Sequence, residues 1–198
     1  MKILLSKNLQ IISKYLKTNS IIGFIPTASE VEENKDYMYN DIKLLEDMGY
    51  SLINIDISNS TTEDILSLFK KVDALFVAGG NCFYLLQQLK LKGVLKEVID
   101  FANNKIYIGS SAGSCIACPN IEYVAKLDDK NLAPQLKEYN AMNLINGYIL
   151  PHYLSKKKYT ELSNEIMLDY PNLKFIPLRN NQAIIVNSRT DYRIVDSE

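Results

Sequence analysis

Residues 105–113, KIYIGSSAG, pass from a short apolar run directly into Gly109-Ser110-Ser111-Ala112-Gly113. This is the small-x-Ser-x-small pattern of a nucleophile elbow, a sharp strand-to-helix turn that holds a serine in a strained backbone conformation. Glycines two residues before and after the serine let the strand and the helix approach closely. Ser111 is therefore the candidate nucleophile, although a plain turn rich in glycine and serine would match the same five residues.

The rest of the chain alternates between apolar strands and amphipathic helices. We expect strands at 2–5, 21–25, 51–57, 74–77 and 106–108. We expect helices near 9–16, at 37–48, from Thr61 or Thr62 through Phe69, at 82–91 and at 94–103. Strands separated by helices of this length imply parallel crossovers, which predicts an α/β fold with a three-layer, doubly wound, mostly parallel sheet. Functional residues of such sheets collect at the carboxyl ends of the strands, where Ser111 is expected.

Length and composition limit the classes of function. The 198 residues, 47% of them hydrophobic, suffice for one well-filled core, so residues 1–198 are predicted to form a single domain. The 22 Lys and Arg residues balance 23 Asp and Glu residues without a basic block, which argues against nucleic acid as a partner. The first apolar run is too short for a signal segment, and no later run approaches the roughly 18 residues of a membrane span. We therefore expect a cytoplasmic protein with no membrane partner.

Two glycines follow the strand expected at 74–77. Gly79 and Gly80 would leave backbone N–H groups uncovered beside the elbow. The helix after the elbow offers its free N-terminal amides to the same region. The amides of Gly80 and Ala112 are thus the predicted donors of an oxyanion hole, and a tight strand-to-helix turn is the structural alternative.

The chain contains a single histidine, His152, which follows an apolar, strand-like run that ends at Pro151. A neutral imidazole can take a serine proton near pH 7 and return it to a leaving amine, so His152 is the predicted base. A lone histidine can equally be structural. The acid that would orient the imidazole is left open among Glu122, Asp128 and Asp129, since a serine, acid, histidine order favours this loop.

Cysteines and metal ligands offer weaker interpretations. Cys82, Cys115 and Cys118 are an odd number of cysteines, which is typical of reduced thiols. Cys115 and Cys118 have redox-like spacing, but they fall inside the elbow helix, where packing is the better explanation and where Cys115 lies a turn too far to be the nucleophile. One histidine and three scattered cysteines predict no metal site, and no cofactor is expected. The 13 tyrosines suit core edges or the interface of a homodimer.

Five segments occur in an order that is more specific than any one of them: FIPTAS at 24–29, AGGNCFYLL at 78–86, IGSSAG at 108–113, CPNIE at 118–122 and PHY at 151–153. Together they resemble the dipeptidase E family of serine peptidases over nearly the whole chain. The resemblance implies a flavodoxin-like fold similar to that of class I glutamine amidotransferases. It also implies a cytoplasmic serine exopeptidase for dipeptides or short peptides, with Ser111 as nucleophile and His152 as base. The best-known preference of the family is for N-terminal aspartate.

Two hypotheses of function follow. The first is a serine hydrolase of small peptides, in which Arg179 is a candidate receptor for an aspartyl side chain unless it is a solvated surface residue. The second is a non-catalytic binding or sensory protein that uses the Ser111 pocket to hold a carboxylate or phosphate. Segments 6–19 and 128–129 depart from the family pattern, so the aspartate preference does not transfer directly.

Overall fold

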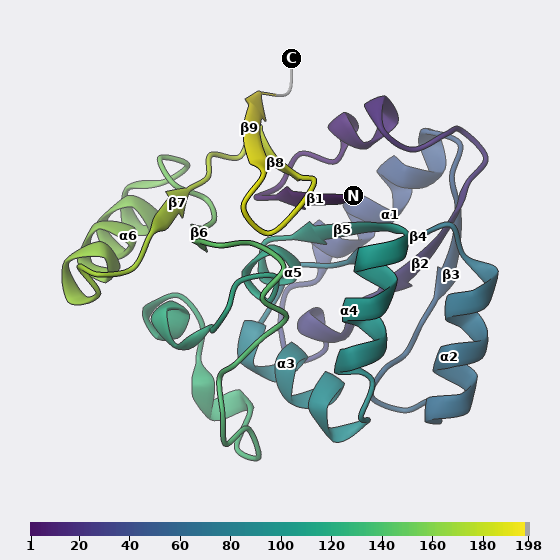
Figure 1. The fold of residues 1–198 in the computed structure, drawn as a ribbon, viewed down its shortest axis with the longest axis horizontal. Coiled ribbons are helices and arrows are strands. Elements are labelled where there is room, and N and C mark those ends of the chain that lie inside the picture. The colour runs from purple at the N-terminus through teal and green to yellow at the C-terminus, as the bar shows by residue number, and fades with distance from the viewer. Residues whose placement is uncertain (197–198) are drawn as a thin grey trace.

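A seven-stranded sheet, in the order β3-β2-β4-β5-β1-β8-β9, forms the centre of the computed structural model, which describes residues 1–196 (Figure 1). Five neighbouring strands run parallel: β3 (Ser51–Asn54), β2 (Ile21–Ile25), β4 (Ala74–Val77), β5 (Ile106–Ser110) and β1 (Lys2–Leu5). Two further strands extend the β1 edge in antiparallel orientation, β8 (Gln182–Val186) and β9 (Tyr192–Asp196). This mostly parallel sheet confirms the predicted α/β class.

Helices cover both faces of the sheet, which gives the three predicted layers. One face carries α2 (Thr62–Lys71), α3 (Cys82–Leu91) and α4 (Leu95–Asn104), and the other carries α1 (Asp36–Asp47) and the 3₁₀ helix η1 (Gln10–Lys14) (Figure 1). Successive residues of a strand enter opposite clusters, as the alternation of a pleated strand requires: in β4, Leu75 packs under α2–α4 and Phe76 packs under α1. No helix among residues 1–196 has the length and apolar character to cross a bilayer.

A second, two-stranded sheet lies beside the main one. β6 (Tyr148–Leu150) pairs in parallel with β7 (Phe175–Pro177), and α6 (Lys157–Asp169) connects them (Figure 1). Short elements complete the described chain: η2 (Thr27–Ser29), α5 (Ala112–Cys115), η3 (Glu122–Lys126) and η4 (Lys130–Leu132). The small sheet is important for the site because the segments that follow β6 and β7 turn back toward the carboxyl end of β1.

Two predicted elements differ in type or length, and three observed strands were not predicted. The helix expected near 9–16 is the short 3₁₀ helix η1, and the strand expected at 51–57 ends at Asn54. That strand stops because the Asp56 carboxylate accepts the Asn59 amide at 3.0 Å and so starts a turn. β7, β8 and β9 have no counterpart among the expected strands.

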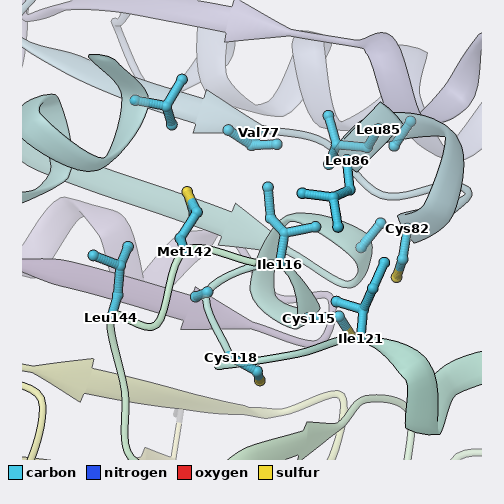
Figure 2. Close-up of a cluster of buried hydrophobic side chains, with 14 of the residues drawn as sticks. Val77, Cys82, Leu85, Leu86, Cys115, Ile116, Cys118, Ile121, Met142 and Leu144 are labelled. Atoms are coloured by element: carbon cyan, nitrogen blue, oxygen red, sulfur yellow. The ribbon is translucent and has the colours of Figure 1, made fainter. Parts of the chain in front are cut away.

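The three cysteines are free and buried in the hydrophobic cluster between the sheet and α3 (Figure 2). Figure 2 shows Cys115 and Cys118 beside Ile116 and Ile121, and Cys82 at the start of α3. Burial raises the pKa of the Cys118 thiol to about 12, so this thiol stays protonated at neutral pH. The packing interpretation of the Cys115 and Cys118 pair is confirmed.

Candidate active site

Ser111 occupies the junction of β5 and α5 in a conformation with φ 48° and ψ −104°, which a residue with a side chain rarely adopts. Its amide donates to the Leu5 carbonyl of the neighbouring strand at 2.9 Å. A Cβ atom at Gly109 would collide with the Gly113 carbonyl, and one at Gly113 would collide with the Val77 carbonyl. The strand-to-helix turn is therefore the strained elbow that the sequence predicts.

Two side chains hold this elbow through hydrogen bonds to its backbone. The Ser114 hydroxyl lies 2.8 Å from the Leu5 carbonyl and 2.7 Å from the Gly109 carbonyl, and it accepts the Leu5 amide at 2.8 Å. The buried Tyr107 hydroxyl donates to the Gly113 carbonyl at 2.6 Å. Sequence reasoning missed both residues, although Ser114 directly follows the motif and carries a polar group where the chain must be buried.

His152 lies just past β6, and its Nε2 atom is 3.0 Å from the Ser111 Oγ atom. The residue has φ 62°, so its backbone is also in the left-handed region. Burial lowers the pKa of the imidazole below its usual value, and the charges of Lys7 and Lys156 act in the same direction, while the hydrogen bond to Asn180 opposes them. The imidazole is thus neutral near pH 7 and able to accept a proton.

Asn180, in the loop after β7, contacts the other ring nitrogen of His152. Its Oδ1 atom lies 2.8 Å from His152 Nδ1. Because an amide oxygen only accepts, Nδ1 carries the ring proton and Nε2 is left free to accept from Ser111. The Ser6 hydroxyl donates to the same Oδ1 at 3.3 Å and accepts the His152 amide at 2.5 Å. Asn180 and Ser6 were not among the predicted residues, and no motif marks either of them.

The prediction that an acid between Glu122 and Asp129 orients the imidazole is wrong, since Asn180 occupies that position. Glu122 is exposed at the start of η3. Asp129 caps η4 by accepting the Asn131 amide at 2.9 Å. Asp128 accepts the Cys82 amide at the start of α3 at 2.8 Å.

Of the two glycines after β4, Gly79 lies against the elbow and Gly80 lies against η2. A Cβ atom at Gly79 would stand 3.3 Å from the Ser111 Cβ atom. Gly80 has φ 132°, and a Cβ atom there would collide with the Ala28 carbonyl, so only glycine fits. Within residues 1–196, neither the Gly80 amide nor the Ala112 amide is hydrogen bonded to a protein acceptor. Both amides are thus available to a ligand.

A cavity of about 880 Å³ opens over Ser111 and His152. Its wall includes Gly80, Ser6 and Asn180 along with side chains from the segment before α1. Arg179 does not line it, because its guanidinium lies 3.5 Å from the Asp196 carboxylate at the surface. Of the two interpretations of Arg179, the solvated surface residue is therefore the one that the structure supports. The volume is within the range of about 300–1,000 Å³ that small-molecule sites occupy.

Comparisons with known proteins find matches over most of the chain. The model of Peptidase family S51 matches residues 3–193. An uncharacterized peptidase of Listeria innocua is 39% identical over 83% of this chain and 79% of its own length. Peptidase E of Escherichia coli is 30% identical over 73% of this chain and 60% of its own length.

A solved structure shares the architecture. The crystal structure of a candidate peptidase E from Listeria monocytogenes superposes with a TM-score of 0.91 at 31% identity, covering 100% of this chain and 98% of that one. A peptidase from an actinobacterium, at 18% identity, shares the fold with a TM-score of 0.70. The chain therefore belongs to peptidase family S51, the dipeptidase E family, and is a hydrolase of the serine peptidase class.

Proposed function

We propose that this chain is a serine exopeptidase that hydrolyses dipeptides or short peptides, with Ser111 as the nucleophile and His152 as the general base. The observation that carries the proposal is the 3.0 Å separation of Ser111 Oγ and His152 Nε2 at a strained elbow. This distance is within hydrogen-bond reach, and the geometry is that of an activated nucleophile and its base.

The proposed reaction has two halves. His152 Nε2 takes the Ser111 proton while Oγ bonds to the scissile carbonyl carbon, which forms a tetrahedral oxyanion. The oxyanion collapses, the carbon–nitrogen bond breaks, and the imidazolium gives the proton to the departing amine. Water then attacks the acyl-enzyme with His152 as base again, which releases the acid and restores Ser111. Asn180 keeps the imidazole in the tautomer that both halves need.

The amides of Gly80 and Ala112 are the proposed oxyanion donors. Their support is that Ala112 directly follows Ser111, that Gly80 lines the same cavity as Ser111, and that neither amide is satisfied by a protein acceptor in the described chain. Weakening one such donor typically costs about a hundredfold to a thousandfold in rate.

A short peptide is the proposed substrate because the cavity has the size of a small-ligand site. A preference for N-terminal aspartate would depend on Lys7 or Lys156, the cationic side chains among the lining residues. A cytoplasmic location is part of the proposal, and three free cysteines suit its reducing conditions. Homodimer formation stays a prediction.

The experiment is a dipeptide library, including aspartyl dipeptides, incubated with the parent protein, Ser111→Ala and Ser110→Ala. Free amino acids are read by mass spectrometry, and a fluorophosphonate reports the reactive serine. We expect turnover and labelling of the parent and of Ser110→Ala, and loss of both in Ser111→Ala by about a thousandfold or more. Full activity of folded Ser111→Ala would contradict the mechanism.

A further inference from the structure

One wall of the cavity over Ser111 is strongly acidic. Carboxylates from the segment before and within α1 and from the loop before η4 line it: Glu32, Glu33, Asp36, Asp41, Asp128 and Asp129. Of the cationic side chains of the lining, Lys156 acts on the His152 imidazole, and Lys7 acts on both the imidazole and the Asp41 carboxyl. A positively charged substrate group would therefore be drawn to the part of this wall formed by Glu32 and Asp128, whose charges act on each other.

Asp128 is the carboxylate of this wall that is most firmly placed. Its Oδ2 atom accepts the Cys82 amide at the start of α3 at 2.8 Å. Its loop is held a second time, because the Asn81 side-chain amide donates to the Asp129 carbonyl at 2.9 Å. One bond to the carboxylate and one to the next carbonyl hold this loop against the start of α3, and Asp128 and Gly80 line the same cavity.

The Asp128 carboxylate lacks a cationic partner. The salt bridges of residues 1–196 include neither Asp128 nor Glu32. Burial raises the pKa of Asp128 to about 6, the charge of Glu32 raises it further, and the thiol and amide of Cys82 lower it. An ionised carboxylate in such surroundings is stabilised by a cation that enters the cavity.

The Tyr37 phenol lies close enough to the same carboxylates for their charges to act on it. Burial raises the pKa of the Tyr37 phenol above its usual value, a hydrogen bond with Ser29 opposes this, and the charges of Glu32, Asp41 and Asp128 raise it again. The Tyr37 hydroxyl itself donates to the Gly79 carbonyl at 3.4 Å. The acidic wall thus reaches the two glycines that border Ser111.

The covalent geometry of a peptide matches this placement. The α-amine of a substrate's first residue is three bonds, or about 4 Å of covalent path, from its carbonyl oxygen. Gly80, the proposed oxyanion donor, is separated from Cys82 by no more than about 7 Å of chain. A carbonyl oxygen at the Gly80 amide can therefore bring its own α-amine to the carboxylate on the Cys82 amide.

We propose that Asp128 binds the protonated α-amine of the substrate's N-terminal residue, with Glu32 adding a second negative charge. This inference rests on the proposed function and deepens it, because it names the group that makes the enzyme an exopeptidase. A substrate whose amine is acylated loses the cation and leaves the carboxylate buried without a partner. The enzyme then discriminates between free and blocked N-termini through a binding contact and not through the reacting atoms.

The test compares a dipeptide amide, Ala-Phe-amide, with its N-acetyl form on the parent protein, Asp128→Asn and Glu122→Gln. Asn keeps an acceptor for the Cys82 amide and removes the charge. We expect Asp128→Asn to lower kcat/KM for the free peptide by about ten- to a hundredfold, mainly through KM, and to leave the acetylated peptide unaffected. Glu122→Gln, which removes an exposed charge outside the lining of this cavity, is expected to behave as the parent.

Each other outcome overturns the proposal. Equal losses on both peptides would indicate a structural role for Asp128, and no loss on either would indicate no role. If the parent protein reacts with the fluorophosphonate and cleaves both peptides equally, the amine contact alone is contradicted. If the parent is neither labelled nor active, both the amine contact and the proposed function are contradicted. If Asp128→Asn does not fold, the test uses the parent protein and an α-hydroxyacyl analogue of the peptide, which lacks the cation. The proposal requires that the parent cleave this analogue at least tenfold less efficiently than the aminoacyl amide.

Discussion

The two halves of the proposed catalytic pair are held in different ways. Ser111 is held mainly by close backbone packing, because the carbonyls of Gly113 and Val77 leave no room for a Cβ atom at Gly109 or Gly113. The buried Tyr107 and Ser114 hydroxyls add hydrogen bonds to the same backbone. His152 is held by side chains, since its amide and its Nδ1 atom depend on Ser6 and Asn180. A position set by backbone contacts cannot relax without moving a strand, whereas a hydrogen-bonded side chain can be lost while the fold persists.

This contrast predicts two kinds of damage. Substitutions on the serine side should lower stability and activity together. Substitutions on the histidine side should lower activity and alter its pH dependence while the molecule stays folded.

The largest effect is expected for Gly113→Ala. The new methyl group would collide with the Val77 carbonyl of β4, so β4 and α5 must separate. We expect a loss of about 3 kcal/mol in the free energy of unfolding. We also expect a fall of about a hundredfold or more in kcat, because the nucleophile is displaced. Urea unfolding and steady-state peptide hydrolysis measure the two.

Gly93→Ala is the matched control for this substitution. Gly93 also has a positive φ, 66°, but a Cβ atom there meets nothing within 4 Å. It should cost about 1 kcal/mol from backbone strain alone and leave kcat unchanged. Equal destabilisation by the two substitutions would contradict the view that close backbone contact holds the elbow.

Asn180→Ala tests the histidine side and should have a smaller effect. Removal of the amide leaves His152 Nδ1 without its acceptor and frees the ring to rotate and change tautomer. We expect kcat to fall about tenfold. KM and the unfolding midpoint should stay close to those of the parent. A loss of stability as large as that of Gly113→Ala would erase the distinction between the two halves.

The fold was predictable where the information is local. Strands β1, β2, β4 and β5 and helices α1–α4 appear where hydrophobic periodicity indicates them, and Ser111 appears at the elbow because the five-residue pattern carries its own steric reason. β7 and β8 were missed because their partners are distant in sequence: β7 pairs with β6, and β8 pairs with β1, at the other end of the chain. β9 pairs only with β8 and was missed along with it. Nothing in residues 182–186 alone distinguishes an added antiparallel strand.

The site was predictable to the same extent. Ser111 and His152 could be named from a motif and from the single histidine, but Ser6 and Asn180 reach His152 across 146 and 28 residues of chain. Loop residues of such common types carry no periodicity or spacing signal. The prediction of an orienting acid between Glu122 and Asp129 was wrong, because the order of residues along the chain does not indicate which loop the small second sheet brings to the imidazole.

Asn180→Asp tests the pH dependence of kcat that the contacts of His152 predict. In the parent, burial lowers the pKa of His152, so the base is neutral at pH 7 and kcat should fall only on the acid side, with a midpoint below about 6.5. A carboxylate at Nδ1 favours the imidazolium and raises this pKa, so the midpoint should move up by about one unit. The profile of kcat, which reports the bound state, measures the shift and avoids the titration of Asp128 in the free enzyme. A downward shift would contradict the assigned Nδ1 contact.

Ser6→Ala should give the smallest effect of the series. Ser6 accepts the His152 amide, and His152 has a strained φ of 62°, so the hydroxyl supports a backbone conformation and touches the base only at its edge. Removal of one buried hydrogen bond should cost about 1 kcal/mol, which corresponds to a fall of about fivefold or less in kcat if all of it acts on the position of the ring. Ser13→Ala, which removes the exposed bond to the Gln10 carbonyl, should change neither kcat nor the melting temperature. A Ser6→Ala loss as large as that of Asn180→Ala would mean that the His152 backbone, and not its ring contact, holds the base, and the histidine half would then resemble the serine half.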